Sequence, residues 1–192
     1  NPSTFGYDPT MQDYPFDLDK AKQLVKEAGA EGKELLLVGQ NANRWLKDRE
    51  VQEATAAMIG KSGLNVTLKL YEIAEWQKVL FEMENPVAAA VYTSIGNDLL
   101  DPDRIFAAFI KTGGRVSTYS RPELDQMIDA ERAELDQNKR AELLRKLARI
   151  VHDDAMIIPL AQLNWIYGVS PKLKFAPIPN GQLPLARMTL SG

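Results

Sequence analysis

The sequence has 192 residues, and 45% of them are hydrophobic, enough for one ordinary domain or two small ones with real cores. The formal net charge is −3 with acidic and basic residues interleaved, which indicates no basic surface for nucleic acid. Cysteine is absent, so disulfides, thiol nucleophiles and cysteine-ligated zinc are excluded. Every apolar run is far shorter than the ~20 residues that a membrane-spanning helix needs.

The first 16 residues are rich in Pro, Tyr and Asp and predict an irregular segment. The chain does not begin with Met and shows no charged-then-apolar signal segment. We therefore expect a processed or excised piece whose signal peptide lies outside it.

Helical and strand patterns then alternate along the chain. Asp17 is a candidate N-cap and Gly29 a helix stop, and a period of two over "NVTLKLYEI" predicts a strand. The expected helices are 17–29, 48–63, 74–85, 103–110, 121–135 and 138–154, and the expected strands are 34–39, 65–73, 86–95 and 156–169. Val51, Ala54, Met58 and Ile59 are expected to form the inward stripe of the second helix.

This order predicts an α/β fold. Strands that alternate with amphipathic helices are typical of a mostly parallel sheet flanked by helices on both faces. In such sheets, ligands bind outside the carboxyl ends of the strands. The loop "SIGNDLLD" follows the third predicted strand and lies at such an end.

This loop carries three carboxylates within six residues. Asp101 precedes Pro102 as an N-cap and Asp103 falls in the first helical turn, so both have a structural role. Asp98 has no such role, and its spacing alone leaves two possibilities open, a solvated loop acid or a ligand-binding carboxylate. The loop lacks the glycine and the bidentate glutamate of a calcium loop, so no metal is expected.

Other motifs favour structural explanations. "GKS" at residues 60–62 closes a helix instead of opening one, so it is not a phosphate loop. His152 lies beside acids near a helix end, with no nucleophile motif to serve. Ser120 is expected to cap the following helix. Trp45, which follows "GQNANR" after a strand end, is the tryptophan best placed for a pocket.

The segments in this order resemble the C-terminal lobe of the bacterial extracellular solute-binding proteins of family 5, which serve peptide, dipeptide and nickel ABC importers. "FGYDPTMQDYPFDLDKAKQLVKEAG" is similar to the Tyr-Pro-x-Asp-x-x-Lys-Ala segment of that family. "GNDLLDPDRIFAAF" is similar to its Gly-Asp-x-x-Asp-Pro-Asp loop. "YSRPELDQMIDAERAELDQNKRAELLRKLARIVHDDAMIIPL" resembles its Tyr-Ser-x-Pro-Glu-x-Asp segment, the Arg-rich helix and the strand that begins Ile-Pro-Leu.

The resemblance implies a lobe of the type II periplasmic-binding-protein fold, in which two lobes close around a solute. Residues 17–170 would form the C-terminal lobe, and the irregular residues 171–192 would return to a first lobe outside this piece. In peptide-binding members, an Asp three positions before Asp-Pro-Asp pairs with the α-ammonium of the ligand, and Asp98 occupies that place. The approach "YTSIGND" departs from the common aromatic-Thr-Gly pattern by its Ile95.

The expected function is capture of a small polar solute, an oligopeptide or dipeptide, and its delivery to a membrane permease, without catalysis or cofactor. Secondary ligand-binding candidates are Tyr92, Thr93, Ser94, Asn97 and Trp45. The protein is expected to act as a monomer in the periplasm, or as a cell-surface lipoprotein in a Gram-positive host. The alternative is a cytosolic α/β enzyme or regulatory domain that uses Asp98 as an acid or metal ligand.

Overall fold

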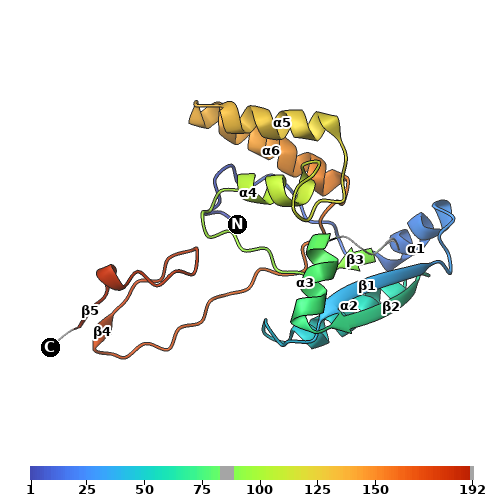
Figure 1. Ribbon diagram of the computed structural model, residues 1–192, viewed down its shortest axis with the longest axis horizontal. Coiled ribbons are helices and arrows are strands. Elements are labelled where there is room, and N and C mark those ends of the chain that lie inside the picture. The colour runs from blue at the N-terminus through green and yellow to red at the C-terminus, as the bar shows by residue number, and fades with distance from the viewer. Residues whose placement is uncertain (83–88, 191–192) are drawn as a thin grey trace. The chain divides into compact units, whose positions relative to one another are not determined.

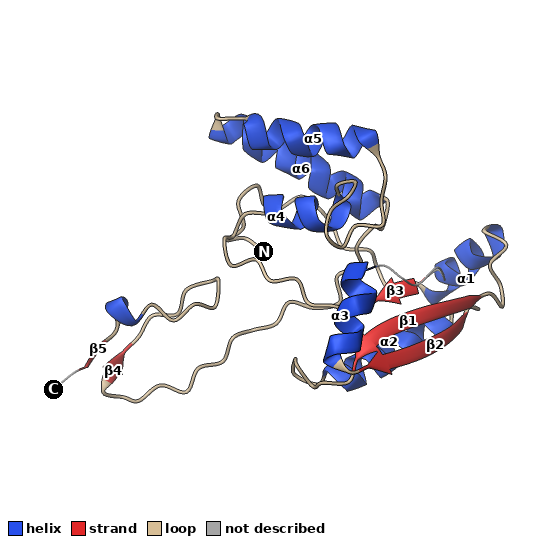
Figure 2. Cartoon of the chain, viewed as in Figure 1, coloured by secondary structure: helices blue, strands red, loops and turns tan. Residues whose placement is uncertain are grey.

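The computed structural model describes residues 1–82 and 89–190 (Figures 1 and 2). It divides into two compact units, each described here by itself. The sheet unit comprises Gln12–Ser94, and the helical unit comprises Asn1–Met11 with Ile95–Gly192. Among the described helices, none combines the length and the apolarity needed to cross a membrane.

The sheet unit is built on three parallel strands in the order β2-β1-β3. They are β1 (Glu34–Gln40), β2 (Asn65–Tyr71) and β3 (Ala89–Val91). The Tyr92 N–H donates to the Val38 carbonyl at 2.8 Å and prolongs the ladder by one bond beyond β3. The predicted strands 34–39 and 65–73 are confirmed. Residues 83–88, which hold the end of the predicted helix 74–85 and the start of the predicted strand 86–95, lie outside the described part.

The helices of the sheet unit are α1 (Leu18–Glu27), α2 (Asp48–Gly60) and α3 (Ile73–Glu82). The chain moves from β1 to β2 in one direction along the sheet and from β2 to β3 in the other. Because such crossovers are right-handed, α2 and α3 fall on opposite faces, as Figure 1 shows. The α/β architecture with helices on both faces is confirmed. Asp17 caps α1 as predicted, accepting the Lys20 N–H at 2.8 Å.

The inward face of α2 differs from the predicted stripe. Val51 and Met58 are 37% and 51% exposed, whereas Gln52 is fully buried. Gln52 packs where the helix meets Gly39, at which a Cβ would stand 1.4 Å from the Gln52 Oε1. A side chain at position 39 would therefore displace Gln52 from this position. Hydrophobic periodicity could not predict the contact, because it is made by a glycine and a polar residue.

The helical unit contains α4 (Asp103–Ile105), which continues as the π-helical turn η1 (Phe106–Ile110), then α5 (Pro122–Ala133) and α6 (Gln137–Asp153). α5 and α6 pack side by side (Figure 2). The core of the unit is made of apolar side chains from these elements: Phe106, Ile110, Leu124, Ile128, Leu144, Leu147 and Val151. The predicted cap at Ser120 is wrong, since α5 begins at Pro122 after Arg121, which makes no side-chain capping bond.

After α6 the chain has little regular structure. The strand predicted at 156–169 is not formed, and the β-structure of this region is a short antiparallel pair, β4 (Leu173–Lys174) with β5 (Thr189–Leu190). The 3₁₀ turn η2 (Leu185–Arg187) lies between them. Within residues 158–169 the exposed large hydrophobic side chains are Ile158, Leu160, Leu163, Trp165, Ile166 and Val169. Extended, apolar sequence forms a strand only where another strand edge pairs with it.

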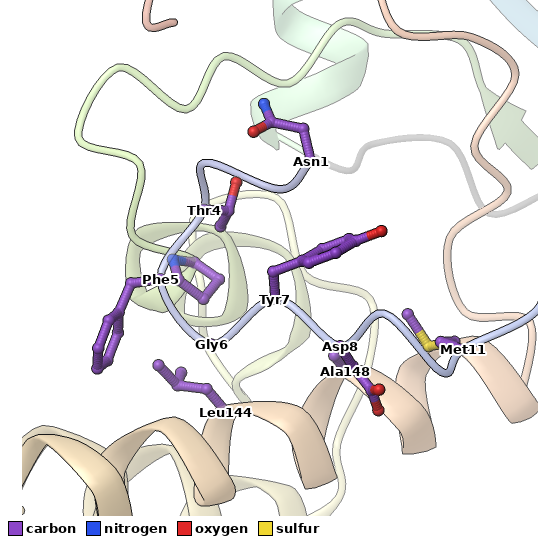
Figure 3. A pocket seen from close by; sticks show the side chains of 10 residues that line it. Asn1, Thr4, Phe5, Gly6, Tyr7, Asp8, Met11, Leu144 and Ala148 are labelled. Atoms are coloured by element: carbon purple, nitrogen blue, oxygen red, sulfur yellow. The ribbon is translucent and has the colours of Figure 1, made fainter.

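The N-terminal segment crosses α6 and leaves a small apolar pocket of about 150 Å³ (Figure 3). Gly6 has a φ of +72° and lies so close to the helix that a Cβ would stand 3.0 Å from the Leu144 Cβ. Asp8 is ion-paired with Arg149 and accepts the Thr10 hydroxyl at 2.6 Å. These contacts attach residues 1–11 to α6.

Candidate ligand-binding site

The loop from Ile95 to Pro102 keeps its shape through bonds within the helical unit. The side-chain oxygen of Asn97 accepts the Asp101 N–H at 3.1 Å, and the main-chain carbonyl of Asn97 accepts the Leu100 N–H at 3.2 Å. Leu100 has a φ of +55°, an unfavourable conformation for leucine that these bonds enforce. Its carbonyl accepts the Phe5 N–H at 2.7 Å, which ties the loop to the N-terminal segment.

Asp101 and Asp103 are held by arginines of the helices behind the loop. Arg140 of α6 binds Asp101 through both terminal nitrogens, at 2.6 and 3.0 Å, and Arg132 of α5 binds Asp103 through two nitrogens. Asp101 also accepts the Asp103 N–H at 3.0 Å. The predicted N-cap at Asp101 is nevertheless wrong, since α4 begins at Asp103 after Pro102, while Asp103 lies in the first turn as predicted. The hydrogen bond from Arg140 is the main cause that lowers the pKa of Asp101.

A third acid, Glu131 of α5, completes this network. It is fully buried and accepts a bond from the Arg140 Nε at 2.9 Å. Burial, together with the nearby negative charge of Asp103, raises the pKa of Glu131 to about 7. Burial pushes the pKa of Asp103 upward too, but its hydrogen bonds with Arg132 and the positive charges of Arg132 and Arg140 outweigh this and lower it. Asp103 therefore keeps its charge, and Glu131 is the carboxyl group of this pair that takes up a proton.

Asp98 stands apart from this network. Its carboxylate is about half exposed and forms an ion pair with Arg104 at 2.8 Å, a partner that sequence analysis did not foresee. Its main-chain carbonyl accepts a bond from the Asn180 side chain at 3.0 Å, so the C-terminal segment fixes the backbone at this point. Asp98 thus has a fixed backbone and an accessible charge.

In the sheet unit, Trp45 and Tyr92 are brought together beyond the carboxyl ends of β1 and β3. The rings of Trp45 and Tyr92 meet edge to face with centroids 5.9 Å apart, and Trp76 meets Trp45 at 6.4 Å. Burial and the nearby charge of Asp48 raise the pKa of Tyr92, which keeps its phenol protonated. Thr93 and Ser94 follow on the chain, half-buried and exposed respectively. Aromatic faces of this kind offer apolar contact to a ligand.

The same sheet edge holds buried polar side chains. Asp48 accepts the backbone N–H groups of Arg44 and Trp45 through one oxygen, at 2.9 and 3.3 Å, while its other oxygen is buried without a partner. The Gln40 side-chain amide and the Trp76 indole N–H are likewise buried and unpaired. Such groups are ordinarily satisfied by water or by a bound molecule. Sequence analysis missed Gln40 and Asp48 because neither stands in a recognisable motif.

Other chemistry finds little support in the described residues. Across 1–82 and 89–190, no three His, Cys, Asp or Glu side chains are grouped so that they could hold a metal ion. The Nδ1 atom of His152 lies 2.9 Å from the Asp153 carboxylate, a local contact at the end of α6. The helical unit thus provides an accessible carboxylate on a braced loop. The sheet unit separately provides an aromatic cluster and buried polar groups that lack partners among the described residues.

A parallel sheet with helices on both faces, followed along the chain by an acidic loop, is the kind of α/β fold in which ligands bind at the carboxyl ends of the strands. The model of the middle part of the bacterial extracellular solute-binding proteins, family 5, matches residues 1–116. The chain therefore belongs to the bacterial extracellular solute-binding proteins of family 5. Members of this family are solute-binding proteins of transport systems, not enzymes, and they work in the periplasm or outside the cell.

Similar curated proteins include the dipeptide-binding protein of Escherichia coli K12, with 30% identity over 181 residues, covering 90% of this chain and 33% of that protein. Heme-binding protein A of Haemophilus influenzae is 26% identical over 186 residues, covering 90% and 32%. The chain thus spans about a third of the length of the relatives it matches.

Solved structures share the fold. HbpA2 from Haemophilus parasuis matches with a TM-score of 0.82 and 25% identity over 100% of this chain and 39% of its own. The dipeptide-binding protein of Pseudoalteromonas sp. SM9913, solved with Met-Leu, matches with a TM-score of 0.76 and 20% identity over the same shares. The predicted type II lobe is confirmed.

Proposed function

We propose that this chain is the C-terminal lobe of an ABC-importer receptor that captures a small peptide, and that Asp98 binds the α-ammonium group of the ligand. The membership in family 5 supports the class of function. The named relatives include several dipeptide- and di/tripeptide-binding proteins, which favours a peptide as the solute. The enzyme alternative is not favoured, because the matched relatives are binding proteins.

The observation that carries the role of Asp98 is the contrast among the three loop acids. Asp101 and Asp103 are engaged by arginines of α5 and α6, so their charges are already balanced. The Asp98 carboxylate is paired as well, with Arg104, but both of these side chains are about half exposed, and Asn180 holds the Asp98 backbone in place. A carboxylate fixed in this way binds an ammonium group well once lobe closure removes water.

The proposed secondary contacts to the ligand are Tyr92, Thr93, Ser94, Asn97 and Trp45. The aromatic pair Trp45 and Tyr92 would supply apolar surface for a ligand side chain. Asn97 stabilises the loop, because its side-chain oxygen accepts the Asp101 N–H. We therefore assign Asn97 the role of positioning Asp98. Delivery to a membrane permease, action as a monomer and a periplasmic or cell-surface location complete the proposal.

The test is binding of Met-Leu to the full-length protein, measured by isothermal titration calorimetry for wild type and Asp98→Asn. Asp98→Asn removes the charge and keeps the shape, so we expect the affinity to fall by about 10- to 100-fold, the usual effect of losing a charge-assisted hydrogen bond. N-acetyl-Met-Leu, which has no α-ammonium, should lose no affinity when Asp98 is replaced. Equal affinity of both proteins for Met-Leu would contradict the role of Asp98.

A further inference from the structure

We infer that Arg104 is a specificity-determining residue that occupies the ammonium site of the loop when no ligand is bound. This inference rests on the proposed function of Asp98. One nitrogen of Arg104, Nη2, lies 2.8 Å from the Asp98 Oδ1 and 2.5 Å from the Gly96 carbonyl oxygen. A carboxylate and a backbone carbonyl thus converge on a single cationic nitrogen, which is the set of acceptors that a primary ammonium requires.

The two acceptors are positioned independently of Arg104. Asn97 closes the turn through bonds to Leu100 and Asp101, and Asn180 fixes the Asp98 carbonyl. The site is therefore built by the loop and the C-terminal segment, and the arginine only fills it.

Arg104 is easily displaced from the ammonium site. Arg104 projects from the first turn of α4, and the side chains of Arg104 and Asp98 are 52% and 49% exposed. An ion pair as exposed as this one holds its partners weakly, because water screens the charges and the long side chain loses rotamer freedom. A ligand ammonium that reaches the loop can take the place of Nη2, and Arg104 then returns to solvent.

This exchange shapes selectivity. A ligand with an ammonium group offsets the loss of the Arg104 contact, because Asp98 is paired before and after binding. A neutral ligand of the same shape must either leave Arg104 in the site or expose Asp98 to a drier cleft without a cation, which is costly. Arg104 thus lowers the affinity for every ligand that enters the site and disfavours uncharged ligands most.

The test measures Met-Leu affinity of the full-length protein with Arg104→Gln, which removes the competing cation and keeps most of the side-chain length. We expect binding to tighten by about two- to five-fold, the range set by an exposed ion pair. The affinity of Arg104→Gln should also weaken more steeply with added salt, because a cation no longer leaves as the ligand arrives. In an Asp98→Asn background, the substitution at Arg104 should have no such effect.

Arg49→Gln is the matched control. Arg49 and Glu53 form an ion pair at 2.9 Å in the sheet unit, with side chains 55% and 52% exposed, so the two substitutions remove equally exposed pairs. We expect Arg49→Gln to leave Met-Leu affinity unchanged.

The outcomes separate the inference from the proposal on which it rests. If Asp98→Asn weakens binding while Arg104→Gln leaves it unchanged or weakens it, Arg104 is a brace of the loop and the inference is overturned, but Asp98 keeps its role. If neither substitution changes the affinity for Met-Leu, or if wild type does not bind Met-Leu, the inference about Arg104 and the proposed role of Asp98 are both overturned.

Discussion

At the scale of single residues, the acids around the loop differ by what surrounds them. Asp101 and Asp103 are structural because arginines of neighbouring helices bind them, whereas Asp98 is paired with one exposed arginine. Glu131 lies under the network, fully buried, with a pKa raised to about 7. Three carboxyl groups and two arginines therefore brace the loop that presents Asp98.

This network predicts a pH dependence of stability. The pKa of Glu131 is higher in the folded protein than its ordinary value of 4.5, so its contribution to stability is complete below pH 4.5 and is lost as the pH rises through about 7. Between pH 5 and 8 the loss is at most about 2–3 kcal/mol, from 1.36 kcal/mol for each pKa unit. Glu131→Gln imitates the protonated acid. The free energy of unfolding of the variant should therefore equal that of wild type near pH 5 and exceed it near pH 8.

Urea denaturation of the chain at several pH values measures this difference. Glu142→Gln, an exposed acid on α6, is the matched control and should follow wild type at every pH. The network as described would be contradicted if Glu131→Gln showed the same slope of unfolding free energy with pH as wild type.

The sequence could predict part of this site. Helix-start rules correctly predicted Asp103 in the first turn of α4 and separated Asp98 from the structural acids, but they placed the N-cap one residue too early, at Asp101. No periodicity links Arg104 to Asp98, nor Arg140 to Asp101 across 39 positions, because these pairs depend on how loop and helices pack. Glu131 looks like one more polar residue of a helix, and only its burial shows its role.

At the scale of elements, the docking of α2 on β1 explains why a polar residue can be buried. The Gln52 side chain accepts the Gln40 N–H and donates to the Gln40 carbonyl, each at 3.2 Å, and also donates to the Asp48 carbonyl at 2.9 Å. It thus pairs with main-chain groups at the end of β1, and the absence of a side chain at Gly39 gives it room. Hydrophobic periodicity predicted the helix correctly but not the face that it buries.

Gly39→Ala should therefore lower the stability of the fold. The new Cβ would stand 1.4 Å from the Gln52 Oε1, so Gln52 must move and lose its bonds to Gln40. Overpacking of this kind costs about 1–3 kcal/mol in the free energy of unfolding. Gly60→Ala is the control, since a Cβ there meets nothing within 4 Å and alanine favours the helix.

Chemical denaturation of the single variants and of Gly39→Ala combined with Gln52→Ala completes this test. Because removal of the Gln52 side chain relieves the clash, the double variant should be more stable than the sum of the two single effects predicts. Strict additivity would show that the close approach of Gly39 and Gln52 does not govern the docking.

At the scale of the whole molecule, the alternation of helices and strands was enough to predict a parallel sheet covered on both faces. The alternation could not predict that residues 156–169 remain without a strand partner. An apolar, extended stretch of sequence indicates that its side chains are buried, but it does not identify the surface that buries them. Six large hydrophobic side chains of that run are exposed. The boundaries of the lobe at residues 17 and 170, and the return of residues 171–192 to a first lobe, stay predictions.

The central claim is that the chain is part of a solute receptor with Asp98 in its binding site. Native mass spectrometry of the full-length protein, purified gently from its source, tests it most directly in wild type and Asp98→Ala. We predict a bound adduct with the mass of a small peptide in wild type and its loss in Asp98→Ala. An adduct that survives the substitution would place the ligand contact elsewhere, and a metal ion in place of an organic ligand, or no adduct under any condition, would contradict the account.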